Sequence, residues 1–386
     1  MSTEPTNLPS YAICTPEKAA QYAVYTEQGH WSLLPPEIFW KDRYSFLREH
    51  GYLLRPRYNP TWTPSWLNTN RDPDFCEDSI KTMLPKKRAV MDATRLLDGS
   101  RVSIKRVSTL NNEIKIARYL SSDVLQKEPD NHCILMLDVL TDPIEPSTAL
   151  MVMPYLRPFD NPPFGAIGEV LDFVRQTLEG LSFMHRHGVA HRDCAAGNIM
   201  MDARSIYPKD HHPVRLDYTP DGVFDAPQYN RIDHPVRYYF IDFGISSLFQ
   251  PGESRLVVGA KGQDKSPPEL SNKIPYDPFP LDVYILGHVY QEEFVEKYHG
   301  LEFLEPLISS MMHPQPNRRP TPESAQQLFK DISSRINDIT FRWRLRPRKE
   351  TISERVVYDT VSVAREGLYQ LKRFMAGGDR KWYVAP

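Results

Sequence analysis

Apolar and polar residues alternate along the stretch RVSIKRVS, which predicts a β-strand. The stretch RAVMDATRLL before it is also strand-like, and the Asp98-Gly99 pair between the two favours a hairpin turn, because glycine accepts a positive φ. The segment NNEIKIARYLSSDVL then has helical spacing, with Ile114, Ala117 and Leu120 recurring at about one turn. Two short apolar runs, HCILMLDVL and TALMVMPYL, have the length of strands. The pattern predicts a small β-rich part with a helix.

The second half of the chain has a different pattern. After residue 168 it becomes mostly helical, and EVLDFVRQTLEGLSFMHRHG is typical of a long amphipathic helix that ends at Gly188. Residues 1–74 are rich in Pro, Trp, Tyr and Asn, and only PPEIFWKDRYSFLREHGY is helix-like there. We therefore expect an α+β protein in which residues 1–74 form an extension that lies on the following domain.

Composition excludes several classes of protein. The chain has 386 residues, enough for one two-lobed unit with extensions or for two domains. A net charge of −2 provides no basic field for nucleic acid or an anionic membrane, and no apolar run is long enough to span a bilayer. The start, MSTEPTNLPS, is unlike a secretory signal. The four cysteines are far apart and lack CxxC spacing, which argues against disulfides and zinc. We expect an intracellular protein, cytoplasmic or nuclear.

Two motifs carry the candidate chemistry. HRDCAAGN spans residues 191–198, and YFIDFGIS spans residues 239–246. The first resembles the H-R-D…N catalytic loop of protein kinases, and the second resembles their D-F-G triplet. Both follow VSIK at 102–105, in the family's order, and precede SPPEL, LDVYILG and NRRPT, which resemble later kinase motifs. The chain thus resembles a divergent eukaryotic-type protein kinase.

The resemblance implies a bilobal protein-kinase-like fold, with a five-stranded sheet and one helix over a larger helical lobe. The kinase domain would span residues 75–340, divided into an N-lobe at 75–155 and a C-lobe at 156–340. An insert at about 203–237 would lengthen the link between the two motifs, and residues 341–386 would form a C-terminal extension.

The resemblance also assigns roles in phosphoryl transfer, where catalysis is mostly positioning and charge stabilisation. Asp193 would orient the attacking hydroxyl and accept its proton. Asn198 and Asp242 would supply oxygen ligands to Mg²⁺. Lys105 would contact the α and β phosphates of ATP, and Glu113 would hold that lysine by an ion pair. Glu113 follows Lys105 by only eight residues, about half the family's spacing, so its helix would have to be short at its start.

The run MVMPYL resembles the strand that leads into the hinge between the lobes. Met153 would lie at the back of the adenine pocket, and the backbone of Pro154 and Leu156 would face the adenine edge. Gly244 would allow a sharp turn after the metal ligand.

Five further residues would have structural or regulatory roles. His191 would pack beneath the catalytic loop, and Asp282 would hydrogen-bond to the backbone of that loop. Arg319 would pair with Glu269. Arg192 would meet a phosphorylated residue in the family, but the segment after D-F-G contains no Thr or Tyr. Its partner would then be a carboxylate, a serine phosphate or none.

The sequence departs from the family at three places. The segment IKTMLPKKRAVMD, where a glycine-rich loop is expected, has no glycine, although Lys86, Lys87 and Arg88 offer charge for phosphate contacts. Ala195 stands where Ser/Thr kinases carry Lys, and the run Ala-Ala-Gly lacks the Arg of tyrosine kinases. The insert contains several histidines without regular metal-ligand spacing.

Three interpretations stay open. The first is an ATP- and Mg²⁺-dependent kinase acting on a protein hydroxyl, with Ser/Thr favoured over Tyr. The second is a pseudokinase that serves as a binding or scaffold module, which the missing glycine-rich loop favours. The third is a small-molecule phosphotransferase, which the match to the activation-segment and late-arginine motifs opposes.

Overall fold

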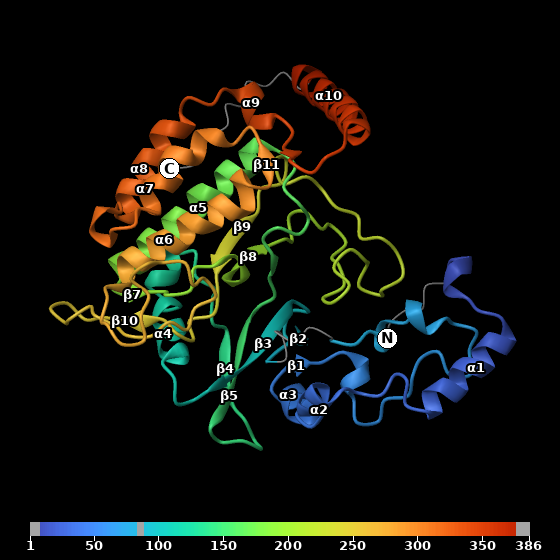
Figure 1. Ribbon diagram of the computed structural model, residues 1–386. Helices are drawn as coiled ribbons and strands as arrows, with labels where there is room; N and C mark the ends of the chain where they lie inside the picture. Colours follow the sequence, from blue (N-terminus) through green and yellow to red (C-terminus); the bar gives the residue numbers. More distant parts are fainter. Residues whose placement is uncertain (1–7, 83–88, 376–386) are drawn as a thin grey trace.

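The computed structural model describes residues 8–82 and 89–375 (Figure 1). A five-stranded antiparallel sheet has the order β1-β2-β3-β5-β4, and the predicted hairpin turn joins β2 to β3 with Gly99 at φ 71°. The expected helix follows as α4. These elements are β1 (Tyr52–Leu53), β2 (Val90–Arg95), β3 (Arg101–Ser108), α4 (Glu113–Leu120), β4 (Asp138–Thr141) and β5 (Thr148–Pro154).

The two faces of this sheet belong to different cores, because side chains alternate along a strand. Val102 and Ile104 of β3 are fully buried in a cluster with side chains of the N-terminal extension. Val107 of the same strand faces the opposite side, in the large core that also contains Ile116 and Leu120 of α4. Lys105 shares the face of Val107. Strand β3 therefore separates the extension from the side of the sheet on which the motif lysine lies.

The N-terminal extension contains more helix than its pattern predicts. The single helix expected over PPEIFWKDRYSFLREHGY is two short helices, α2 (Pro35–Lys41) and α3 (Tyr44–Glu49). An unpredicted helix, α1 (Pro16–Glu27), begins after Thr15, whose hydroxyl accepts the Lys18 amide at 3.4 Å. No residue of α1 is buried, so it lacks the apolar stripe by which a helix is usually found in a sequence.

The extension contributes buried side chains to the core on the face of the sheet that carries Val102 and Ile104. Trp40, Leu47 and Tyr58 pack in the cluster that contains Val102 and Ile104. Strand β1 lies within the extension and pairs with β2 at the sheet edge, so that α2 and α3 lie close to β1 (Figure 1). The extension thus covers apolar surface that the sheet alone would expose.

The second part of the chain is mainly helical, as expected. Helix α5 runs through its centre and packs against α8, and short strand pairs connect the helices (Figure 1). The helices are α5 (Ile167–Arg186), α6 (Pro278–Tyr290), α7 (Glu305–Met311), α8 (Pro322–Ser333), α9 (Asp338–Arg342) and α10 (Ile352–Met375), with a π-helical turn at Gln291–Val295. The strands are β6 (Arg157–Pro158), β7 (Val189–Ala190), β8 (Ile199–Asp202), β9 (Arg237–Phe240), β10 (Ser247–Leu248), β11 (Tyr298–His299) and β12 (Arg346–Pro347).

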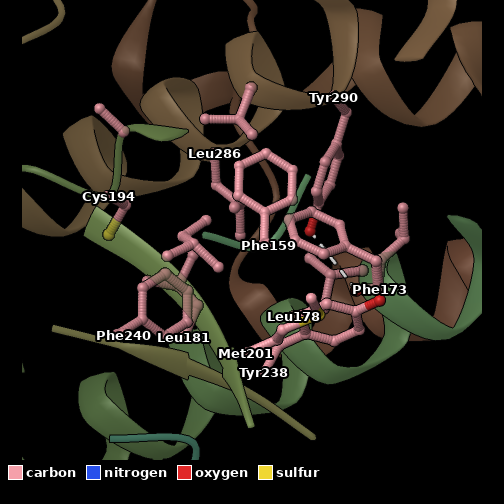
Figure 2. Close-up of a cluster of buried hydrophobic side chains, with 14 of the residues drawn as sticks. Phe159, Phe173, Leu178, Leu181, Cys194, Met201, Tyr238, Phe240, Leu286 and Tyr290 are labelled. Carbon is pink, nitrogen blue, oxygen red and sulfur yellow. Dashed lines mark hydrogen bonds between the residues drawn. The ribbon is translucent and has the colours of Figure 1, made fainter. Parts of the chain in front are cut away.

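An aromatic cluster holds these helices and strands together (Figure 2). Phe173 of α5 packs edge-on against Tyr238 of β9 and Tyr290 of α6, and the Tyr290 hydroxyl lies 2.7 Å from the Thr177 hydroxyl. Cys194, next to Asp193, is also drawn in this cluster and is fully buried. Its burial raises the pKa of the thiol. The motif loop is therefore anchored in the core through Cys194.

The predicted insert lies between β8 and β9 and packs on Tyr155, in the segment that connects the sheet to the helical part. The Tyr155 hydroxyl donates to the Pro213 carbonyl at 3.0 Å, and Arg101 of β3 forms an ion pair with Asp210 at 2.8 Å. The insert also reaches the extension, because the Tyr11 hydroxyl donates to Val223 at 3.2 Å. It thus contacts the sheet, the link and the extension together.

The basic residues that the sequence offers for phosphate contacts, Lys86, Lys87 and Arg88, lie outside the described residues. No group of three or more His, Cys, Asp or Glu side chains among residues 8–82 and 89–375 is arranged to hold a metal. Within the same residues, no helix combines the length and the apolar character needed to cross a bilayer.

Candidate active site

Lys105, Glu113 and Asp242 meet although they come from three separate elements. The Lys105 ammonium lies 2.5 Å from Glu113 Oε1 and 2.8 Å from Asp242 Oδ1. Glu113 is the first residue of α4, and its amide is held by the Asn111 side chain at 3.1 Å. A helix that begins at the glutamate itself explains how a separation of only eight residues suffices for the pair.

The electrostatics of this cluster keep the lysine charged. Burial by itself would lower the pKa of Lys105, but the charges of Glu113 and Asp242 outweigh that effect and raise it. Burial would raise the pKa of Asp242, but the neighbouring lysine lowers it overall. Burial dominates at Glu113 and raises its pKa despite the lysine. The cluster presents a fixed cation beside an ionised carboxylate.

Asp193 and Asn198 lie together in the loop between β7 and β8. The Asn198 amide nitrogen donates to Asp193 Oδ2 at 2.8 Å and to the Asp193 carbonyl at 2.9 Å. Because these contacts use the nitrogen, the amide oxygen of Asn198 is the atom left for a metal ion.

The β8–β9 pair brings the two motif loops to one end of the strands. Ile199 pairs with Phe240, and the Ile241 amide donates to the Asn198 carbonyl at 2.9 Å. Asn198 directly precedes β8, and Asp242 follows β9 by two residues. An amide oxygen and a carboxylate at this end fit Mg²⁺, which takes oxygen ligands and is usually held by one or two protein groups together with substrate phosphates.

Both motif loops have unusual backbone conformations. Arg192 has φ 67° and Asp242 has φ 63°, values that side-chain-bearing residues rarely adopt. Such conformations persist where the surroundings hold them, and they concentrate at functional sites. Asp242 Oδ1 also accepts the amide of Gly244 at 3.2 Å, which closes a tight turn after the aspartate.

Asp282 holds the backbone of the HRDCAAGN loop, residues 191–198. This fully buried carboxylate accepts the His191 amide at 2.8 Å and the Arg192 amide at 2.6 Å, and His185 Nε2 lies 3.0 Å away. His191 is also fully buried, with Nε2 3.0 Å from the Ile241 carbonyl oxygen. The two motif loops are therefore joined through His191.

The remaining predicted pairings have definite partners. Arg319 holds Glu269 through both carboxylate oxygens, at 2.5 and 2.9 Å. Arg192 contacts the carbonyls of Ile245 and Val258, each at 3.2 Å, and the Ser247 hydroxyl at 3.3 Å. These three partners of Arg192 are neutral groups, and none of them is a carboxylate.

The predicted hinge residues end strand β5. Met153 and Leu156 are buried, and Pro154 pairs with Val102 of β3. The amide of Tyr155 donates to the Arg101 carbonyl at 3.2 Å. Proline has no amide hydrogen but keeps its carbonyl, so Pro154 can only accept from a ligand.

Sequence reasoning missed one residue near Asp193. The Gln263 amide donates to Asp193 Oδ1 at 2.7 Å, although the two residues are 70 positions apart. No local pattern points to this contact. In hindsight, the sequence feature that points to this contact is a pair of glycines, Gly197 and Gly262, near the two residues that meet.

Two surface hollows lie elsewhere. One of about 440 Å³ is lined by Arg106 and Glu145 among others, and one of about 310 Å³ is lined by Gln126 and Arg237 among others. Neither includes the motif residues, so the candidate site is defined by its side-chain geometry rather than by these hollows.

Comparisons with known proteins agree with the motifs at a coarse level. No family model matches the chain. A stretch of 138 residues is 28% identical to a protein named "Light-sensor Protein kinase" of Ceratodon purpureus and covers 34% of this chain and 10% of that protein. A stretch of 123 residues is 30% identical to "Probable serine/threonine-protein kinase KKQ8" of Candida glabrata and covers 31% of this chain and 12% of that protein. The chain thus matches about a tenth of the length of these curated relatives, and both matches support a kinase-like relationship.

Proposed function

We propose that this chain is a protein kinase that transfers the γ-phosphate of Mg²⁺-ATP to a protein hydroxyl, with Ser/Thr favoured over Tyr. The observation that carries the proposal is the position of Lys105, whose ammonium lies 2.5 Å from Glu113 and 2.8 Å from Asp242. The Lys105 ammonium comes from the sheet and the Asp242 carboxylate from the helical part, and the two are in contact. Phosphate oxygens need a nearby cation, and a metal ion needs a nearby carboxylate.

The proposed reaction follows from the separate tasks of the side chains. Lys105 binds the phosphates of the nucleotide, while Glu113 fixes the direction of its side chain. Asn198 and Asp242 would hold Mg²⁺, which neutralises charge on the phosphates when it is bound. Asp193 would orient the attacking hydroxyl and accept its proton as the new P–O bond forms, while the bond from the γ-phosphorus to the β–γ bridging oxygen breaks and ADP leaves.

The proposal includes the fold and its divisions. Residues 75–340 would form a bilobal kinase domain, with the insert at 203–237 and extensions on both sides. The adenine edge would face the Pro154 carbonyl and the Leu156 amide, with Met153 behind it. A kinase acting on proteins implies a protein partner.

A binding module without turnover is the second candidate, and two features favour it. Lys105 is bound directly to Asp242, so an incoming nucleotide must replace that contact before the metal is held. The segment where a glycine-rich loop is expected carries no glycine.

One experiment separates the two. The full chain is incubated with Mg²⁺-ATP alone and with peptide mixtures, and phosphate transfer is followed by intact mass. Asp193→Asn should abolish transfer and keep nucleotide binding, whereas Asp242→Asn should abolish Mg²⁺-dependent binding as well. The type of residue modified distinguishes Ser/Thr from Tyr. Equal transfer by wild type and both variants refutes the site, and nucleotide binding without transfer supports the binding module.

A further inference from the structure

The segment of residues 262–263 lies directly on the carboxylate of Asp193. The main-chain amide of Gln263 donates to Oδ1 at 2.7 Å. Its side-chain amide lies 3.4 Å from Oδ2, the oxygen that also accepts from Asn198. Both oxygens of the proposed catalytic base therefore face donors, one of which comes from a distant part of the chain.

Two glycines provide the room for this approach. A Cβ on Gly197 would lie 2.6 Å from Gln263 Oε1, closer than real Cβ contacts. A Cβ on Gly262 would lie 2.9 Å from the Arg192 carbonyl and 3.1 Å from Asp193 Oδ1. Neither glycine has a positive φ, so each matters here through space rather than backbone conformation: Gly262 lies against the Arg192 backbone, whereas a Cβ on Gly197 would displace the flexible end of the Gln263 side chain.

The segment is also held from its other side. Asp264 accepts from the Ser266 amide at 2.8 Å and the Ser266 hydroxyl at 2.7 Å, and its second oxygen lies 2.8 Å from His288 Nδ1 on helix α6. The Lys265 ammonium donates to the Ala260 carbonyl at 2.6 Å. These contacts on both sides of Gln263 fix its direction toward the loop.

The catalytic loop itself offers little to do this task. Positions 195 to 197 are Ala, Ala and Gly, so no polar side chain lies between Asp193 and Asn198 except Cys194, which is buried in the core. Donors on a carboxylate restrict its rotation. Asn198 donates to Oδ2 and the main-chain amide of Gln263 donates to Oδ1, while the side-chain amide of Gln263 is a second donor beside Oδ2.

We propose that Gln263 is a positioning residue for Asp193, and that Gly197 and Gly262 leave the space in which Gln263 approaches the carboxylate. The inference rests on the proposed kinase function. Each carboxylate oxygen has two lone pairs; Oδ2 faces both side-chain amides, whereas Oδ1 accepts one main-chain amide and keeps a lone pair for the attacking hydroxyl. The neutral amide orients the base without pairing its charge.

The test compares phosphate transfer by Gln263→Ala, Gln263→Glu and Gly197→Ala in the full chain. Gln263→Ala keeps the main-chain donor and removes only the longer side-chain contact of 3.4 Å, so it should lower kcat about fivefold, with the KM for ATP unchanged. Gln263→Glu keeps the shape but places a second carboxylate near Asp193, so its kcat should fall several-fold further. A packing role predicts the reverse order, because Glu fills the same space and Ala does not.

The Gly197→Ala variant tests the glycine. It should lower kcat as Gln263→Ala does, and the double variant should lose no more than either single one, since both changes remove the same contact. Gln327→Ala and Gln327→Glu, on the exposed face of α8, are matched controls that should leave kcat unchanged.

The outcomes separate this inference from the function on which it rests. Wild-type transfer with unchanged kcat in Gln263→Ala, or an additive double variant, overturns the positioning role alone. A wild-type protein without transfer overturns the proposed function and the positioning role together. In that case the contact between Asp193 and Gln263 is structural only. It can still be measured as coupling between the unfolding free energies of Asp193→Ala, Gln263→Ala and the double variant.

Discussion

Replacing Glu37 by Gln should destabilise the protein strongly, because Glu37 is the counter-ion of a fully buried arginine. Its carboxylate accepts Arg57 Nε and Nη2, each at 3.2 Å, and also the Leu34 amide at 2.8 Å and the Tyr58 hydroxyl at 3.0 Å. Gln has the same shape, but it lacks the charge and turns an NH₂ group toward these donors. The substitution therefore removes the charge of the pair with little change in volume.

The size of the effect follows from burial. Removing one partner of a buried ion pair costs about 3–5 kcal/mol. Arg57 is 0% exposed but keeps a hydrogen bond to the Asp78 carbonyl at 2.8 Å, so we expect the lower end, about 3 kcal/mol. The unfolding entropy of a chain of 386 residues is about 0.8 kcal/mol per kelvin, so Tm should fall by about 4 °C.

The assay is thermal unfolding of Glu37→Gln beside Glu49→Gln, an exposed control at the end of α3 that should stay within about 1 °C of wild type. Burial alone would raise the pKa of Glu37, but the Leu34 amide and Arg57 lower it overall. A carboxylate with a lowered folded pKa stabilises the protein above its unfolded pKa, and this is lost as pH falls through the folded value. The difference from wild type should therefore shrink below about pH 4. Equal Tm values for both variants at neutral pH would refute the reasoning.

Three further outcomes are expected. Lys105→Met should reduce phosphate transfer at least 100-fold in the intact-mass assay, since one preorganised donor to developing charge supplies about 2.7–4 kcal/mol; unchanged transfer contradicts the role of Lys105. Asp282→Asn should lower stability by about 3 kcal/mol in denaturant unfolding, because one oxygen that accepts a loop amide becomes a donor; an unchanged midpoint argues against the anchor. Arg319→Lys should lose the two-pronged grip on Glu269 and lower Tm, whereas Lys330→Arg on the exposed face of α8 should not.

The motif residues were predictable because their information is local. Asp193 and Asn198 lie within one loop, so the linear motif alone gives their proximity. The strand with Lys105 and the helix that begins at Glu113 follow from residue periodicity. The five-stranded sheet with its single helix was expected from the family resemblance, and five strands and the helix are present, but β1 (Tyr52–Leu53) comes from the extension and not from residues 75–155. The roles assigned to these residues stay predictions.

The rest depends on contacts between distant residues. Helix α1 buries no side chain, so no apolar period marks it. The contact between Gln263 and Asp193 spans 70 positions, and that between Tyr155 and Pro213 spans 58. Glutamine and tyrosine in such segments are usually ordinary surface residues. Only the folded chain shows which of them meet a carboxylate or a carbonyl.

Strand β3 packs against the extension on one face and carries Lys105 of the candidate site on the other. Val102 and Ile104 pack into the extension's core, while Lys105, on the opposite face of the same strand, reaches Glu113 and Asp242. Adjacent side chains of a strand share one backbone, so a shift of the buried face moves the lysine as well. Hydrogen bonds of 2.5 and 2.8 Å tolerate little displacement. The extension therefore packs on the strand that positions Lys105, whose ion-pair partners, Glu113 and Asp242, come from outside the extension.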